Sequence, residues 1–161
     1  MLNILIIPLS ILIFYIYLSD DIINKISFLI TSSGYLALIY LSIVLLIPLL
    51  KLKSTQYKAK DFGLATFYLS LIHFLIYALD NGVDLEVLSD DLFFRNYIIS
   101  GYLALLLFIP MYLTSFSFFQ IKYPYWKKIH KIIYLIYIFI LTHIYFIIKA
   151  DYLYLFIFIM L

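Results

Sequence analysis

Long apolar runs constrain this chain more than any other feature. Five stretches are each apolar over the roughly 20 residues that a membrane-spanning helix needs, and they cover residues 2–18, 28–50, 61–79, 97–118 and 129–149. A sixth segment, 152–161, is too short to cross unless the bilayer thins or a neighbouring helix tilts. We therefore predict an all-α integral membrane protein. Its helical bundle has five full transmembrane helices plus a short sixth C-terminal segment, in a single domain over residues 1–161.

The composition excludes most soluble functions. Of the 161 residues, 66% are hydrophobic and only 12% are charged, whereas a soluble domain has about twice that charged fraction. The chain has no cysteine, which excludes disulfides, iron–sulfur clusters and thiolate-bound haem. It also has no glycine-rich nucleotide-binding loop. We predict no separate soluble domain and no internal repeat.

The distribution of charge predicts the orientation in the membrane. Eight of the eleven basic residues lie in segments 51–60 and 120–131, as Lys51, Lys53, Lys58, Lys60, Lys122, Lys127, Lys128 and Lys131. By the positive-inside rule both segments are cytoplasmic, which makes the N-terminus cytoplasmic as well. The acidic residues other than Asp61 fall on the opposite side, most of them in segment 80–96. We interpret these lysines as topology signals and not as binding sites for lipid head groups. The partners expected of a chain with such apolar spans include membrane lipid but no nucleic acid.

The three histidines are the candidate site residues. His73 lies thirteen residues after Lys60, and His143 lies thirteen residues after His130. At 1.5 Å per residue, His73 and His143 each lie about 20 Å from the cytoplasmic edge, on spans that run parallel. Imidazole is a common haem ligand. The matched depth therefore predicts that His73 and His143 are the two axial ligands of a haem b. Two axial imidazoles leave no open iron position, which favours electron transfer over oxygen chemistry.

Other interpretations of the histidines remain open. A histidine in a membrane helix can serve only to hydrogen-bond a neighbouring helix. His130 lies at the cytoplasmic end of its span beside Trp126, where histidine is ordinary, and an ideal helix would place it about 140° around from His143. No fourth histidine exists, so two histidines of one chain cannot hold an inner haem. Either one haem binds and His130 lines a donor site, or His130 holds a second haem with a weak or absent sixth ligand.

Several motifs occur in order between Phe62 and Asp151. They are Phe62-Gly63-Leu64, Leu71-Ile72-His73, Asp91-Leu92-Phe93-Phe94-Arg95, Gly101, Pro110, Leu113-Thr114-Ser115, Trp126-Lys127-Lys128-Ile129-His130-Lys131, Tyr134, His143 and Lys149-Ala150-Asp151. This pattern resembles the ferric reductase-like transmembrane family, and within it the haem-binding subunits of bacterial periplasmic methionine-sulfoxide reductase systems. The resemblance implies b-type haem on these histidines and electron transfer to a soluble molybdenum reductase outside the inner membrane.

The departures from the family pattern bear on the cofactors and the donor. Ala59 and Lys60 stand where the family usually has a pair of arginines linked to flavin binding, and Leu38 stands where a basic residue is usual. These departures weigh against FMN, which the resemblance would otherwise imply. Lacking a nucleotide-binding loop, the chain must receive electrons from quinol or from a separate cytoplasmic flavin reductase. It would then be an electron-transfer subunit and not the catalytic subunit.

Two other functions fit the same residues. The chain could be a stand-alone transmembrane ferric or other metal reductase, or a non-redox membrane protein with incidental histidines. A b-type difference spectrum separates the non-redox protein from both haem proteins.

Overall fold

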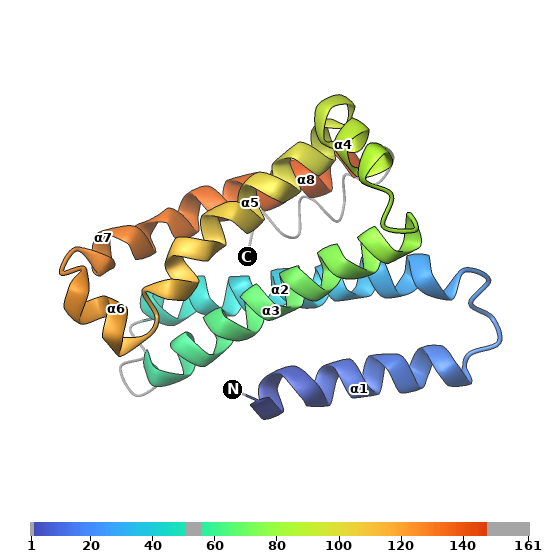
Figure 1. The fold of residues 1–161 in the computed structure, drawn as a ribbon. Coiled ribbons are helices and arrows are strands. Elements are labelled where there is room, and N and C mark those ends of the chain that lie inside the picture. The colour runs from blue at the N-terminus through green and yellow to red at the C-terminus, as the bar shows by residue number, and fades with distance from the viewer. Residues whose placement is uncertain (1, 51–55, 148–161) are drawn as a thin grey trace. The chain divides into compact units, whose positions relative to one another are not determined.

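The computed structural model describes residues 2–50 and 56–147, and every regular element in these residues is a helix. The elements are α1 (Leu2–Leu18), α2 (Lys25–Leu49), α3 (Gln56–Asp80), α4 (Leu85–Phe94), α5 (Asn96–Leu113), α6 (Ser117–Lys122), α7 (Trp126–Ile129), a 3-10 helix (His130–Ile132) and α8 (Ile133–Ile147) (Figure 1). They fall into two compact units that divide between Val83 and Asp84. The assignment of residues 1–161 to a single domain stays a prediction.

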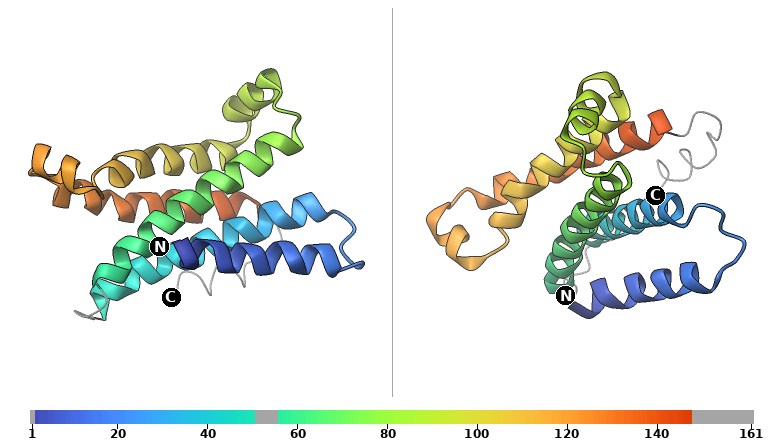
Figure 2. Two further views of the ribbon diagram at one scale, coloured as in Figure 1. Left: turned by 60° about the horizontal axis from the view of Figure 1, so that its bottom comes forward. Right: turned by 45° about the vertical axis from the view of Figure 1, so that its right-hand side comes forward.

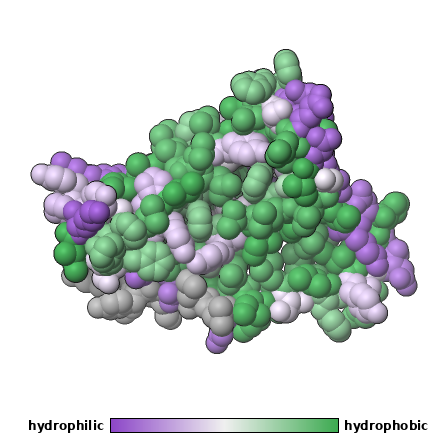
Figure 3. All heavy atoms as spheres, in the orientation of Figure 1, coloured by the Kyte–Doolittle hydropathy of each residue, from purple (hydrophilic) through white to green (hydrophobic). Residues whose placement is uncertain are grey.

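The expected all-helical membrane protein is confirmed, but the number of full spans is not. Within the described residues, four segments are long and apolar enough to cross a membrane: Lys25–Leu49, Ala59–Asp80, Asn96–Leu113 and Trp126–Ile147. Helix α1 is apolar but has only 17 residues. The predicted short segment 152–161 lies outside the described residues. Hydrophobic side chains cover the helices and hydrophilic ones gather at their ends (Figure 3).

The first unit is built on the packing of α2 along α3 (Figures 1 and 2). Its buried cluster consists of Ala37 and Tyr40 from α2 with Ala65 and Leu69 from α3. Side chains from α1 pack against this cluster; they are Ile4, Leu5 and Leu9. Small residues at the contact allow two membrane helices to approach closely.

A proline in α1 is compensated by a tyrosine of α2. Pro8 lies inside α1 and has no N–H, so it cannot donate the helical hydrogen bond to the carbonyl of Ile4, four residues earlier. The hydroxyl of Tyr40 donates to this carbonyl at 2.6 Å. Lipid offers no replacement donor. The bond therefore links α1 to α2 at the turn where Pro8 leaves a carbonyl of α1 without a backbone donor.

Tyr40→Phe should lower the free energy of unfolding by about 2 kcal/mol, because it leaves the Ile4 carbonyl without its donor. Thermal unfolding in detergent, followed by circular dichroism, measures the loss. Pro8→Ala restores an N–H at residue 8, so the cost of Tyr40→Phe should shrink in that background. The control is Tyr134→Phe, which changes an exposed tyrosine. An equal cost of Tyr40→Phe with and without Pro8 would contradict this account.

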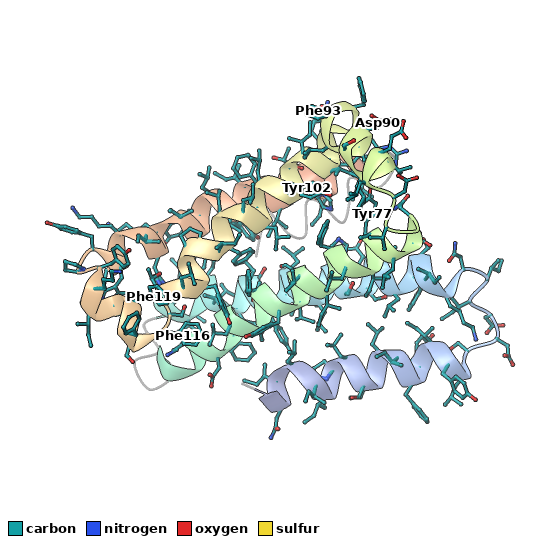
Figure 4. The ribbon with its side chains drawn as sticks, viewed as in Figure 1. Tyr77, Asp90, Phe93, Tyr102, Phe116 and Phe119 are labelled. Carbon is teal, nitrogen blue, oxygen red and sulfur yellow. The ribbon has the colours of Figure 1, made fainter. Side chains whose placement is uncertain are left out.

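The second unit is built on the packing of α5 and α8. The predicted span 97–118 ends earlier than expected, because α5 stops at Leu113 and the separate helix α6 follows. Pro110 lies in the last turn of α5, and a proline removes one helical hydrogen bond. Thr114 Oγ1 donates to the Pro110 carbonyl at 2.7 Å and caps this end. Phe116 precedes α6 and Phe119 lies within it (Figure 4).

The acidic segment 80–96, which lies between two of the predicted spans, contains helix α4. Asp84 caps its first turn by accepting from the Glu86 N–H at 2.9 Å. Asp91 is buried and pairs with Arg95 Nε at 2.9 Å. Asp90 and Phe93 also belong to this helix (Figure 4). Helix α4 therefore contains one buried carboxylate, Asp91, in an ion pair, whereas Asp84, Glu86 and Asp90 remain exposed.

Candidate functional site

His73 lies in α3 with its imidazole against the backbone of α2. Its Nδ1 is 2.8 Å from the carbonyl oxygen of Ile30 and 3.4 Å from Ser33 Oγ. Gly34 makes this approach geometrically feasible. A Cβ on Gly34 would lie 3.2 Å from His73 Cε1 and 3.3 Å from Nδ1. The ring is thus held against a backbone position that has no side chain.

His143 is held in α8 by the equivalent contacts on α5. Its Nδ1 bonds the carbonyl oxygen of Tyr97 at 2.5 Å. A Cβ on Gly101 would lie 3.0 Å from His143 Nδ1 and 3.1 Å from Cε1. In each unit, therefore, a histidine bonds a carbonyl of the neighbouring helix and lies over the glycine four residues further along that helix.

A repeated hexapeptide underlies this correspondence. Residues 33–38 and 100–105 both read Ser-Gly-Tyr-Leu-Ala-Leu. The expectation of no internal repeat is therefore wrong. This repeat was also the sequence signal that could have identified Gly34 and Gly101; the carbonyl-bearing residues, Ile30 and Tyr97, each lie three residues before it. Within it the alanines, Ala37 and Ala104, are buried in their units.

The carbonyl bonds determine which ring nitrogen carries the proton. A carbonyl oxygen only accepts hydrogen bonds, so Nδ1 of His73 and Nδ1 of His143 must each be the donor. The neutral ring then has its lone pair on Nε2, the nitrogen that can bind a metal. A second hydrogen bond that fixes tautomer and ring orientation is the usual support of a metal-ligating histidine. Both rings therefore have the protonation and support that an axial ligand needs.

His130 has the opposite arrangement. Its Nε2 lies 3.1 Å from Thr114 Oγ1. The Thr114 hydroxyl also bonds the Pro110 carbonyl at 2.7 Å, and in either direction its contact with His130 engages Nε2 in a hydrogen bond. The Trp126 ring lies edge-on at 5.4 Å. His130 thus uses for a hydrogen bond the nitrogen that His73 and His143 keep as a lone pair.

The 140° separation expected between His130 and His143 is offset by a local distortion. Both side chains contact α5, at Thr114 and at Gly101. A 3-10 helix over His130–Ile132 precedes α8. It turns about 120° per residue, against 100° in an α-helix. Three such residues turn His130 towards the helix that His143 also contacts.

Comparison with known proteins places this chain in a class of membrane proteins. The sequence model of the ferric reductase like transmembrane component matches residues 33–141, which include His73 and His130 and end two residues before His143. The chain belongs to this family, and the resemblance found in its motifs is confirmed. It is a multi-pass membrane protein of the ferric reductase-like class.

Particular relatives are the subunits named "Protein-methionine-sulfoxide reductase heme-binding subunit MsrQ" from Brucella ovis, Brucella suis and Brucella abortus. Each is 36% identical over 75 residues, which cover 45% of this chain and 34% of the relative. The match thus spans about a third of the length of these curated relatives. No solved structure matches the chain.

Gly34→Ala and Gly101→Ala should each lower the free energy of unfolding by about 1–2 kcal/mol, because the new methyl group presses on a histidine ring that is tied to a carbonyl. Thermal unfolding of the purified protein measures the effect. The matched control is Gly63→Ala in α3, where a Cβ meets nothing within 4 Å. There alanine should be neutral or stabilising, because glycine is the weaker helix former. Equal effects at all three positions would show that the histidine rings do not pack tightly against Gly34 and Gly101.

Proposed function

We propose that this chain is a haem-binding electron-transfer subunit of a bacterial inner membrane, with its N-terminus in the cytoplasm. The proposal rests on the matching surroundings of His73 and His143, each of which contacts a carbonyl and a glycine of the neighbouring helix. In each, the imidazole Nδ1–H bonds a backbone carbonyl, which is the tautomer whose Nε2 carries the lone pair that a metal would bind. Haem b supplies reversible one-electron transfer when two imidazoles bind its iron.

The residues fit haem in three respects. The tautomer is the one that binds iron through Nε2. The carbonyl bond limits ring rotation, so the ligand is oriented before the cofactor arrives. The surroundings are apolar membrane helices, which suit a macrocycle with a hydrophobic face. That His73 and His143 serve one haem is supported by their equal predicted depth on two parallel spans.

We assign His130 to the donor side of the protein and not to a tightly bound haem. A second haem on His130 would require the bond from Nε2 to Thr114 to break. The ring instead lies beside Trp126, and Lys127 and Lys128 lie over the rings of Trp126 and Tyr125. Aromatic and basic residues of this kind are common at a membrane surface, where a quinol head group or a cytoplasmic flavin reductase can approach. FMN is not part of the proposal, because Ala59 and Lys60 replace the arginine pair linked to flavin.

The proposed electron acceptor is a periplasmic methionine-sulfoxide reductase that contains molybdenum. Support comes from the relatives, which are named as subunits of a methionine-sulfoxide reductase. The acidic segment 80–96 on the extracytoplasmic side is the surface at which the reductase would dock. Asp91 does not contribute to this surface, since it is buried and paired with Arg95.

His73→Ala or His143→Ala should abolish the low-spin b-type spectrum of the purified protein, because each change removes one axial nitrogen. Optical and electron paramagnetic resonance spectra, with haem quantified per chain, make the measurement. His130→Ala is the matched control and should keep one low-spin haem per chain. If both His73→Ala and His143→Ala retained a normal spectrum, the ligand assignment would be wrong. Two tight low-spin haems that both survive His130→Ala would refute the single-haem assignment.

Membranes without this protein should fail to supply electrons to the periplasmic methionine-sulfoxide reductase. Reduction of methionine sulfoxide by the reductase added to such membranes, with quinol as the donor, should fall to background. It should return when the wild-type chain is restored, but not with His73→Ala. Unchanged rates without the protein would argue for another acceptor. Reduction of ferric chelates by the pure protein, independent of any partner, would favour the stand-alone metal reductase.

A further inference from the structure

Each carbonyl that holds a histidine also accepts a bond from a serine. Ser33 Oγ donates to the Ile30 carbonyl at 2.9 Å, the same oxygen that His73 Nδ1 reaches. Ser100 Oγ donates to the Tyr97 carbonyl at 2.8 Å, the same oxygen that His143 Nδ1 reaches. Both serines are buried, with 0% and 4% exposure. They are the first residues of the two hexapeptides.

A serine bonded to its own helix is common and by itself signifies nothing. In this chain Ser42 Oγ bonds the Leu38 carbonyl at 2.9 Å, and Ser115 Oγ bonds the Met111 carbonyl at 2.8 Å. Ser33 and Ser100 differ from these serines in the carbonyl oxygen to which they donate. In both units it is the acceptor of the histidine, and in the first unit Ser33 Oγ also lies 3.4 Å from His73 Nδ1.

Sharing one acceptor weakens both bonds. A carbonyl oxygen has two lone pairs and a limited electron density, so a hydroxyl bonded to it reduces its attraction for a second donor. The strength of the Nδ1–H bond in turn sets how much imidazolate character the ring has. A weaker bond makes Nε2 a poorer electron donor to a bound metal. For haem, a less basic axial ligand stabilises ferric iron less and raises the reduction potential.

We propose that Ser33 and Ser100 are positioning residues that weaken the Nδ1–H bonds of His73 and His143 and so raise the reduction potential of the bound haem. This inference rests on the proposed function, because it needs haem on these histidines. It assigns to the repeated Ser-Gly pair two separate tasks. The glycine makes room for the ring, and the serine adjusts how strongly the ring is held.

The test is a redox titration of the full-length haem protein with Ser33→Ala, Ser100→Ala and both changes together. Each single change should favour the oxidised haem roughly threefold, the size expected for a change in one hydrogen bond. That is a potential lower by about 30 mV, with tenfold equal to 59 mV for one electron. The double variant should shift about twice as far. Ser42→Ala and Ser115→Ala are the matched controls, and their potentials should stay at the wild-type value.

Two further measurements separate tuning from a merely structural role. Haem per chain and the low-spin optical spectrum should be unchanged in the serine variants, while the spread of the ferric g values should narrow as imidazolate character increases. Ser33→Thr and Ser100→Thr keep a hydroxyl and should retain the wild-type potential. Potentials of the alanine variants equal to those of the controls, or raised, with haem retained, would overturn the inference. So would loss of haem in the alanine variants, or threonine variants that shift as alanine does.

The proposed function fails in a different way. If the wild-type chain binds no haem at all, the ligand assignment is wrong and the tuning role falls with it. If wild type binds one low-spin haem and only the serine effect is absent, the proposed function stands and the inference alone is rejected.

Discussion

A polar ring inside a membrane helix bundle must obtain its hydrogen bond from the protein, because lipid has none to give. In both units of this chain the donor is a histidine Nδ1 and the acceptor is a backbone carbonyl of the adjacent helix. Much of the site depends on this one bond. It fixes the tautomer, it brings the ring onto the helix surface, and it demands a glycine one turn further along to make room. For the same reason the Tyr40 hydroxyl donates a hydrogen bond to the Ile4 carbonyl, which Pro8 leaves without a backbone donor.

Much of the fold could be predicted from the sequence, because the length of an apolar run is a direct consequence of the thickness of the bilayer. The main helices lie where the apolar runs predicted them. The errors occur where local hydrogen bonding overrides apolarity. The predicted span 97–118 includes residues 114–118, yet Pro110 and the cap by Thr114 end α5 before them. No secondary structure was predicted for the acidic segment 80–96, where Asp84 caps helix α4 and Asp91 pairs with Arg95.

The sequence analysis selected the histidines of the candidate site, but it did not identify the residues that hold the histidine rings in place. Ligand residue types are few in this chain, so three histidines in apolar runs are conspicuous. Their supports are a backbone carbonyl, a glycine and a serine, which carry no charge and no metal-binding group. Only the repetition of Ser-Gly-Tyr-Leu-Ala-Leu marks them. The orientation of His130 could not be predicted either, since it depends on a 3-10 turn that an ideal helix count ignores.

The repeat also bears on why the inner level has a single histidine. In the second unit the residue thirteen positions after Gly101 is Thr114, and the residue thirteen positions before His143 is His130; these two are bonded. The same offsets in the first unit lead from Gly34 to Ile47 and from His73 to Lys60. Neither Ile47 nor Lys60 carries an imidazole, so the first unit has no counterpart of His130 at this level. The outer positions of the two units therefore have the same chemistry, whereas the inner positions differ. The hydrogen bond between Thr114 and His130 Nε2 agrees with the proposal that His130 lies on the electron-donor side and does not bind a metal.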